Sequence, residues 1–325
     1  MENSRLGKKS DHVLIRDFRR SDLSDLLDLF PMCIAGEFEI SSFDPDHIAL
    51  MVNRVFGRTG RLIMRLLQLF GKEPMKFLVA EADCRIVGTS IINAQGRFGY
   101  ISAVMVHPDY RRKGIATKLM TNALNYLRRR GSERAVLHVV STNTAAISVY
   151  VGLGFKAFEH SVYFVREMDS VQMLEPTSGL KIREFQRKDL DQVYSLVRAS
   201  ESPDHLRIFD FSKKNLKTPF LQRMLRFSSR GKLVALLGER LVGYVEAAYT
   251  TPKETGGISS IYVSSEGRSL GVLRLLIEAA CNEIVEGGVR RIRIAVPVAR
   301  QELSETLTSL GFKEALPIDA MVVEL

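Results

Sequence analysis

The sequence predicts an α/β (α+β) protein of two tandem domains, each with a mixed, mostly antiparallel sheet flanked by helices. Three observations support this prediction. The chain has 325 residues, which is more than one domain usually holds. Its second half repeats the first. Within each half, short apolar strands joined by tight turns precede longer amphipathic helices, which predicts antiparallel pairing first and a parallel crossover later.

The internal repeat consists of four pairs of segments that occur in the same order in both halves. They are 15–23 and 182–190, 76–88 and 232–243, 100–106 and 257–263, and 153–156 and 310–313. Chance does not preserve order and spacing over four segments, so we interpret them as a duplicated domain. A loop-rich stretch around Pro176 and Gly179 separates the copies and predicts domains at 12–170 and 180–325.

The elements of the first half follow from its hydrophobic periodicity, since alternation predicts strands and a 3.6-residue stripe predicts helices. We expect strands at 76–82, 85–93 and 99–106, a helix at 114–130, a strand at 134–140, a helix at 144–152 and a strand near 160–168. The helix at 114–130 is the most clearly marked, because its apolar residues form one stripe.

Composition limits the class of protein. The chain is 46% hydrophobic and 26% charged, as is usual for a soluble globular protein. The three cysteines lack metal-ligand or redox spacing, which favours a reducing compartment. Residues 1–12 are polar, and the longest apolar run, 62–70, is short and interrupted by an arginine. We therefore expect a cytoplasmic protein without a signal peptide or a membrane span.

The net charge of +9 indicates an anionic partner such as a phosphorylated cofactor, nucleic acid or an acidic membrane, although a solvated basic surface explains it equally well. No aromatic platform or groove-reading helix accompanies the charge, so we expect no nucleic acid. Basic amphipathic stretches at 47–72 and 219–227 could contact a membrane or an acidic partner. Their repetition favours a helix that walls a binding groove.

Residues 104–117 form a strand, a turn at Pro108 and the start of the long helix at Gly114. Free N–H groups and the positive end of the helix dipole point out of this turn, and the small residues Gly114 and Ala116 let an anion approach. Three cations at 111–113 stand where the dipole disfavours them by about 0.3–1 kcal/mol each. A bound polyphosphate explains them; a solvated basic turn is the alternative.

A second segment follows, in which Asn143 takes a helix N-cap position and Tyr150 lies two turns into that helix. Together the two segments resemble the GNAT superfamily of acyl-CoA-dependent N-acetyltransferases. Arg111-x-x-Gly114-x-Ala116 fits its pyrophosphate-binding signature, and Asn143-x-x-Ala146-x-x-x-Tyr150-x-x-x-Gly154-Phe155 fits its second signature. The resemblance covers most of 13–168 and, more weakly, 180–325.

The resemblance implies acetyl-CoA as cosubstrate, an amine acceptor and no metal. The strand backbone that would pair with the pantetheine arm is that of Val104, Met105 and Val106. The backbone that would hold the pyrophosphate is that of Arg111, Arg112, Lys113, Gly114, Ile115, Ala116 and Thr117. Asn143 would bind the cofactor where the central strands separate, and Tyr150 would protonate the departing thiolate. A buried aromatic on the helix face is the alternative for Tyr150.

Attack requires a neutral amine and therefore a base. His138 lies five residues before Asn143, where the ribosomal-protein N-terminal acetyltransferases that this segment resembles carry a glutamate. A histidine, with an ordinary pKa of about 6.5, could do the same work, and a structural histidine is the alternative. We expect His107 to shape the turn. The weaker candidates for the base are Glu37, Glu39 and Glu81.

The second copy lacks these residues. Arg268-x-x-Gly271 remains, but Leu273 replaces the small residue, Leu307 takes the position of Tyr150, and Arg300 takes that of Asn143. We expect a catalytic domain at 12–170 and a degenerate one at 180–325 that supports structure, shapes acceptor binding or binds cofactor without catalysis. The tandem arrangement is similar to that of mycothiol synthases, in which the second copy is the better preserved.

The predicted function is transfer of an acetyl group from acetyl-CoA to a primary amine, either a peptide or protein N-terminus or a small amine. Direct attack in a ternary complex is expected. The alternative is a non-catalytic acyl-CoA-binding regulatory or interaction protein. The sequence is compatible with a homodimer.

Overall fold

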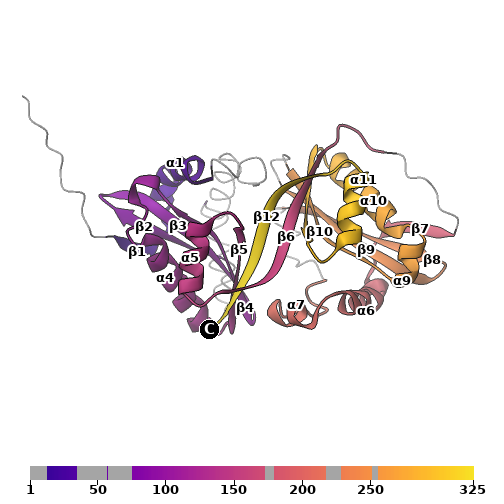
Figure 1. Cartoon of the computed structure of the whole chain (residues 1–325), viewed down its shortest axis with the longest axis horizontal. Coiled ribbons are helices and arrows are strands. Elements are labelled where there is room, and N and C mark those ends of the chain that lie inside the picture. The colour runs from indigo at the N-terminus through magenta and orange to yellow at the C-terminus, as the bar shows by residue number, and fades with distance from the viewer. Residues whose placement is uncertain (1–12, 35–56, 58–74, 173–178, 217–227, 251–254) are drawn as a thin grey trace, which may run out of the picture. The chain divides into compact units, whose positions relative to one another are not determined.

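The computed structural model describes residues 13–34, 57, 75–172, 179–216, 228–250 and 255–325, which form two compact units (Figure 1). Unit 1 comprises Met1–Val139, Asn143–Lys156 and Met321–Leu325, and unit 2 comprises Val140–Thr142 and Ala157–Ala320. The predicted amphipathic stretches at 47–72 (apart from Gly57) and 219–227 lie outside the described residues, as do Glu37 and Glu39.

The first-copy residues that the structure describes in unit 1 form four antiparallel strands and a parallel fifth. Its elements are β1 (Leu14–Asp17), the 3-10 helix η1 (Arg20–Asp22), α1 (Leu23–Ile34), β2 (Lys76–Ala82), β3 (Arg85–Gln95), β4 (Phe98–Val106), η2 (Pro108–Tyr110), α4 (Ile115–Arg129), β5 (Arg134–Val140) and α5 (Thr144–Gly152). β1 to β4 pair antiparallel in chain order, and β5 pairs parallel with β4. The predicted mixed sheet is confirmed.

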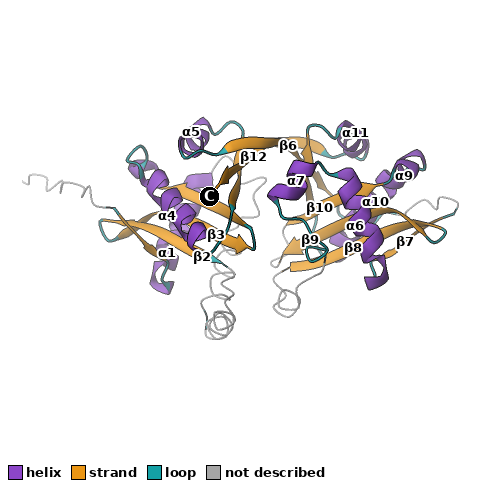
Figure 2. Ribbon diagram, turned by 90° about the horizontal axis from the view of Figure 1, so that it is seen from below, coloured by secondary structure: helices purple, strands orange, loops and turns teal. Residues whose placement is uncertain are grey.

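Helices of unit 1 lie beside its strands (Figure 2). They pack against the strands in two separate apolar cores. The first core joins the buried stripe of α4, including Leu119 and Leu127, to residues of β2 to β5. The second joins α1 to the strands through Phe30 and Met105. Gly99 permits the close approach of α4, because a Cβ at that position would lie 2.1 Å from the Leu127 side chain.

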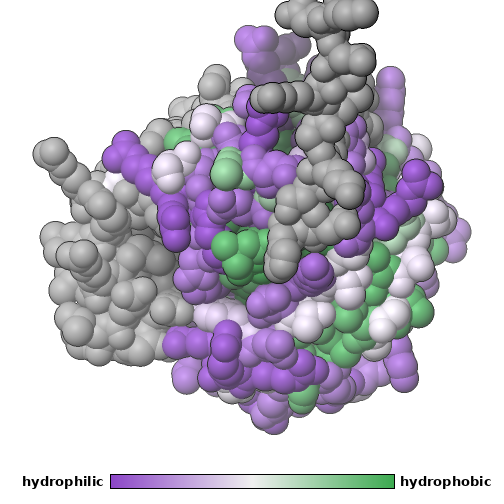
Figure 3. Space-filling view, turned by 90° about the vertical axis from the view of Figure 1, so that its left-hand side faces the viewer, coloured by the Kyte–Doolittle hydropathy of each residue, from purple (hydrophilic) through white to green (hydrophobic). Residues whose placement is uncertain are grey.

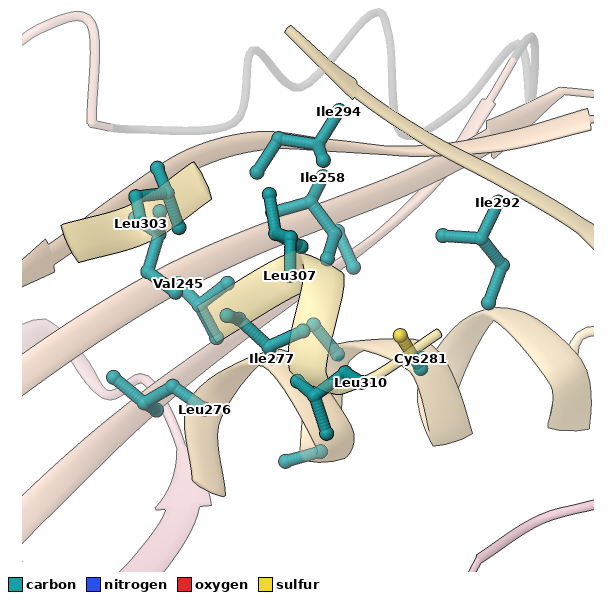
Figure 4. Close-up of a cluster of buried hydrophobic side chains, with 14 of the residues drawn as sticks. Val245, Ile258, Leu276, Ile277, Cys281, Ile292, Ile294, Leu303, Leu307 and Leu310 are labelled. Carbon is teal, nitrogen blue, oxygen red and sulfur yellow. The ribbon is translucent and has the colours of Figure 1, made fainter. Parts of the chain in front are cut away.

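Unit 2 repeats this plan. Its elements are β6 (Lys156–Glu167), β7 (Leu180–Glu184), η3 (Arg187–Asp189), α6 (Leu190–Ser200), α7 (Pro203–Ile208), β8 (Ser228–Leu237), β9 (Arg240–Thr250), β10 (Thr255–Val263), α9 (Ser265–Ser269), α10 (Val272–Glu286), β11 (Arg291–Pro297), α11 (Gln301–Ser309) and β12 (Lys313–Glu324). β7 to β10 pair antiparallel and β11 pairs parallel with β10, as in unit 1. A core around α10 and α11 fills one face (Figure 4).

The duplication extends to the hydrogen bonds of the first turn. In unit 1, Arg16 holds Asp22 with two bonds of 2.7 and 2.9 Å, and the Asp22 carboxylate also accepts a backbone N–H at 2.6 Å. In unit 2, Arg183 holds Asp189 with bonds of 2.7 and 2.8 Å, and a backbone N–H adds one of 2.7 Å. The same fork of guanidinium and carboxylate therefore fixes the entry to the first helix of each copy.

Unit 2 contains the final strand of the first copy, and unit 1 contains the end of the final strand of the second copy. β6, the last strand of the first copy, pairs antiparallel with β11 in unit 2. β12, the last strand of the second copy, is the neighbour of β5 in the strand order, and its end, Met321–Leu325, belongs to unit 1. There the Leu325 N–H donates to the Glu133 carbonyl at 2.8 Å, and Met321 is buried in the α4 core. The repeat in the sequence did not predict this exchange.

Polar side chains cover most of the described surface on the side of the molecule that Figure 3 shows, with smaller apolar areas between them. Within the described part of the chain, no helix is both long and apolar enough to cross a membrane.

Candidate functional site

The unit 1 sheet opens between β4 and β5. Their parallel ladder joins Phe98 to Arg134, Gly99 to Ala135 and Tyr100 to Val136. Within these two fully described strands the ladder ends there, although β4 continues to Val106. The following stretch of β4 therefore presents backbone groups that an extended ligand can pair with, as an added strand would.

A β-bulge redirects β4 within this opening. The register against β3 shifts, so that Ala103 and Val104 both stand opposite Ser90. Ala103 has a φ of 50°, in the left-handed region, which turns its peptide groups out of the regular ladder. Beyond the bulge, Val104 and Val106 contact the α4 core, whereas Ala103 and Met105 contact the α1 core. The extra residue of the bulge thus shifts the alternation of β4, so that the side chains after it point to the opposite faces from those that a regular strand would give them.

The strand leads through η2 to the N-terminus of α4, where Gly114 is the N-cap with a φ of 72°. A Cβ on Gly114 would meet no atom within 4 Å, so the space in front of the helix is open. The N–H groups of Ile115, Ala116 and Thr117 belong to the first turn, which has no acceptors within the helix; the first intrahelical bond runs from Lys118 to Gly114, at 3.0 Å.

The three cations at 111–113 are exposed beside this helix end. The Arg111 Nε donates to the Val106 carbonyl at 3.2 Å, and the Lys113 Nζ lies 5.2 Å from the centre of the Tyr110 ring. Arg112 has a left-handed φ of 61°. Exposed cations around an open helix N-terminus form a donor set that suits a polyphosphate.

His107 and Cys33 border the same site. The His107 Nδ1 accepts the Asp109 N–H at 3.2 Å, which agrees with its expected role in the turn. The Cys33 thiol of α1 donates to the Val106 carbonyl at 3.4 Å. Burial raises the pKa of this thiol, and the neighbouring Arg111 opposes that rise. Sequence reasoning missed the contact, because α1 and β4 are distant in the chain.

α5 positions two further residues that the sequence singled out. Asn143 is its N-cap, and the side-chain oxygen accepts the Ala146 N–H at 3.1 Å. Tyr150 is 6% exposed and packs on Phe155, with ring centres 6.0 Å apart. It belongs to the α4 core, together with Leu137 of β5.

His138 lies on the opposite face of β5. It is exposed, and it alternates along the strand with Leu137 and Val139, which face the α4 core with Tyr150. The His138 Nδ1 is 2.7 Å from the Tyr100 hydroxyl on β4. The structure therefore brings His138 to the opening but on the other face from Tyr150. Glu81, a weaker candidate for the base, is held by Arg16 at 2.5 Å.

Sequence reasoning also missed Tyr100. Its side chain meets His138 across two strands whose pairing is parallel, and a linear motif does not show such a neighbour. Among the described residues, no group of three or more His, Cys, Asp and Glu side chains could hold a metal ion.

Comparison with known proteins assigns both copies to one family. The model of the acetyltransferase (GNAT) family matches residues 48–155 and 190–312. The chain belongs to the acetyltransferase (GNAT) family. The duplication seen in the sequence is thus a pair of GNAT domains.

Curated relatives match parts of this GNAT chain. The mycothiol acetyltransferase of Streptomyces coelicolor is 31% identical over 97 residues, which is 29% of this chain and 31% of that protein. An acetyltransferase of Sodalis glossinidius is 37% identical over 84 residues, 26% of this chain and 59% of its own length. The N-alpha-acetyltransferase 30 of Schizosaccharomyces pombe is 34% identical over 77 residues, which is 23% of this chain and 51% of that protein. The chain thus spans less than two thirds of each of these relatives.

Solved structures resemble the GNAT chain over nearly its whole length. A tandem GNAT protein from the clavulanic acid biosynthesis pathway has a TM-score of 0.65 at 17% identity, covering 96% of this chain and 98% of its own. A GCN5-related N-acetyltransferase from Sphaerobacter thermophilus has a TM-score of 0.66 at 15% identity, and the match covers 98% of this chain and 97% of that one. At such low identity these structures confirm the tandem GNAT fold and nothing finer.

Proposed function

We propose that unit 1 is an N-acetyltransferase that transfers the acetyl group of acetyl-CoA to a primary amine in a ternary complex. The separation of β4 from β5 carries the proposal, because it leaves a strand edge that ends at an open, basic helix N-terminus. The backbone of Val104, Met105 and Val106 suits the pantetheine arm, and that of residues 111–117 suits the pyrophosphate. Asn143, at the N-cap beside β5, would bind the cofactor amide.

Acetyl-CoA, when bound, supplies an activated acyl carbon, so the C–N bond forms as the C–S bond breaks. We assign His138 as the base that removes the amine proton and Tyr150 as the acid that protonates the thiolate. The positions of the two residues on opposite faces of β5 support an amine arriving from one face and a thiolate leaving on the other. The 2.7 Å contact between the His138 Nδ1 and the Tyr100 hydroxyl would orient the imidazole at the opening between β4 and β5.

The relatives support two classes of acceptor. The fission yeast relative is named an N-alpha-acetyltransferase, which supports a protein N-terminus, and the Streptomyces relative is named a mycothiol acetyltransferase, which supports a small molecule. A non-catalytic acyl-CoA-binding protein is the second candidate function, because Tyr150 and His138 could serve as structural residues.

Turnover of acetyl-CoA with a panel of small amines and N-terminal peptides tests the proposal. We expect acceptor-dependent CoA release, and we expect Tyr150→Phe and His138→Ala to lower kcat by about 100-fold or more, the usual contribution of a general acid or base. Tyr126→Phe is the matched control. Tyr126 is similarly buried, 7% exposed, in the same core, so this change should leave kcat unaltered.

Two results would contradict the assignment. Acetyl-CoA binding without release of CoA for any acceptor would favour the non-catalytic alternative. Full turnover by Tyr150→Phe would show that the thiolate receives its proton from elsewhere.

A further inference from the structure

Unit 2 keeps the shape of a cofactor site. Its strands β10 and β11, described over their full length, pair in parallel up to Ile258 and Ile294 and then separate. Gly271 caps α10 with a φ of 70°, and a Cβ there would meet no atom within 4 Å. These values match those of Gly114 in unit 1, so backbone shape alone would admit a second acyl-CoA.

A side chain of unit 2 already occupies the corresponding strand edge. Arg300 is the N-cap of α11, and its Nη1 donates to the Ile261 carbonyl at 3.1 Å, the equivalent of Val104 in the repeat. The Arg300 Nη2 donates to Glu201 at 2.7 Å. The Tyr262 hydroxyl donates to the same carboxylate oxygen at 2.8 Å. We call Arg300, Glu201 and Tyr262 the Arg300 cluster.

The Arg300 cluster is held from several sides. The Glu201 side chain is 13% exposed and that of Arg300 is 27% exposed. The guanidinium also lies over the Tyr262 ring, 5.2 Å from its centre. Charge-assisted bonds in a partly buried setting are strong, so the guanidinium stays in place. In unit 1 the equivalent Asn143 is shorter and bonds its own helix instead.

Unit 2 also differs from unit 1 at the positions proposed to bind the pyrophosphate and to protonate the thiolate. The cations at 111–113 correspond to Arg268, Ser269 and Leu270, and the Arg268 Nε lies 3.7 Å from the carboxylate of Glu302. Leu307, at the position of Tyr150, is fully buried among the aliphatic side chains of the unit 2 core (Figure 4). Of the three cations of unit 1 only the one at Arg268 remains, next to a carboxylate, and no hydroxyl stands at the position of Tyr150.

We propose that the Arg300 cluster closes the second site, so that the chain binds one acyl-CoA, in unit 1. This inference rests on the proposed function of unit 1. The side chains of the Arg300 cluster connect the end of α6, strand β10 and the start of α11 at the place where a ligand would otherwise bind.

Isothermal titration calorimetry of the full chain with acetyl-CoA tests whether the second site is closed, because it measures how many molecules bind. The variants Gly114→Glu and Gly271→Glu are titrated as a matched pair. Both glycines are left-handed N-caps in open space, so the two changes introduce the same strain and the same charge at equivalent places. We expect one acetyl-CoA per wild-type chain, loss of binding in Gly114→Glu, and unchanged binding in Gly271→Glu.

Two acetyl-CoA molecules per wild-type chain, or loss of a site in Gly271→Glu, would overturn the closure while leaving the proposed function of unit 1 intact. No binding to the wild-type chain would overturn both. Hydrogen exchange of the wild-type protein gives a second measurement that needs no variant. Saturating acetyl-CoA should slow exchange at 104–117 and leave 261–274 unchanged, and protection of both stretches would likewise overturn the closure.

Discussion

Ser90 lies on β3 opposite the bulge of β4, and it is fully buried. Within the described part of the chain its hydroxyl has no hydrogen-bond partner. The neighbouring Thr89 is also buried, but its hydroxyl donates to the Leu78 carbonyl at 3.1 Å. The equivalent of Ser90 in the second copy is Val245, an apolar residue. A buried hydroxyl without a partner costs free energy, whereas a satisfied one contributes to stability.

We therefore expect opposite effects from two adjacent substitutions. Ser90→Ala should raise the free energy of unfolding by about 1 kcal/mol, because it removes the unsatisfied hydroxyl. Thr89→Val should lower it by about 1 kcal/mol, because it removes a bonded one. Urea unfolding of both variants measures the difference. A destabilised Ser90→Ala variant would indicate that the hydroxyl has a partner, such as a buried water.

The residues that sequence could identify are those whose role depends on their immediate neighbours. A helix begins at Gly114 and Asn143 caps the next one, as their places in the chain predict. The sequence did not indicate Tyr100, because its contact with His138 depends on the pairing of β4 with β5. It did not indicate Cys33 either, because the contact with Val106 depends on how the distant helix α1 packs.

At the scale of elements, the first turn of each copy depends on one ion pair. The bonds from Arg183 lower the pKa of Asp189 and outweigh its burial. For Asp22, burial acts in the opposite direction, but the bonds from Arg16 and the backbone prevail, and the pKa is again lowered. A carboxylate with a lowered pKa stabilises the fold above its unfolded pKa of about 3.9 and loses that effect as the pH falls.

Asp189→Asn should therefore lower the free energy of unfolding by about 2–3 kcal/mol at pH 7, because Arg183 loses its charged partner while largely buried. The difference from wild type should shrink as the pH falls below about 4, since the wild-type carboxylate then also becomes neutral. Thermal unfolding between pH 7 and pH 3 measures this trend.

Asp17→Asn is the matched control for that substitution. Asp17 pairs with Lys76 at 2.6 Å but is 68% exposed, so its loss should change stability by less than about 1 kcal/mol. A difference between Asp189→Asn and wild type that stays constant across the pH range would contradict the electrostatic explanation.

Elements were predictable where periodicity defines them. The apolar stripe of α4 and the short apolar runs of β2 and β5 located these elements to within a residue or so. The bulge at Ala103 was not predictable, because it arises from the register between β3 and β4 and not from the residues of β4 alone.

At the scale of the whole chain, unit 1 depends on a segment from the far end of the sequence. Met321–Leu325 supply a buried side chain and a backbone bond to unit 1. Deleting Met321–Leu325 should therefore destabilise unit 1, expose the edge of β5 and abolish acetyl-CoA binding. Amide exchange should rise across β2 to β5 and stay low across β8 to β10, whose contacts lie within unit 2.

Glu324→Gln is the control for this deletion. It removes a pair at 3.7 Å, between Glu324 and Arg134, but leaves the strand in place, so we expect near-normal exchange. Retained protection of β5 in the deletion variant would show that the β12 end contributes little to unit 1.

The sequence predicted two copies of one fold but not how they share strands. The final strands of the two copies have the same pattern, so each could complete either sheet as far as local propensity is concerned. The choice depends on contacts between residues more than 150 positions apart, such as Leu325 with Glu133.

The exchange also orders events during synthesis. Every residue proposed to act on the substrates precedes residue 156, yet the sheet that holds them is completed by Met321–Leu325. At about 5–20 residues per second, a ribosome needs on the order of 10–30 seconds to make the intervening chain. During that interval, β5 of the nascent first copy either has an unpaired edge or pairs with β6 of the same copy. The second copy thus determines when the first can reach its final form.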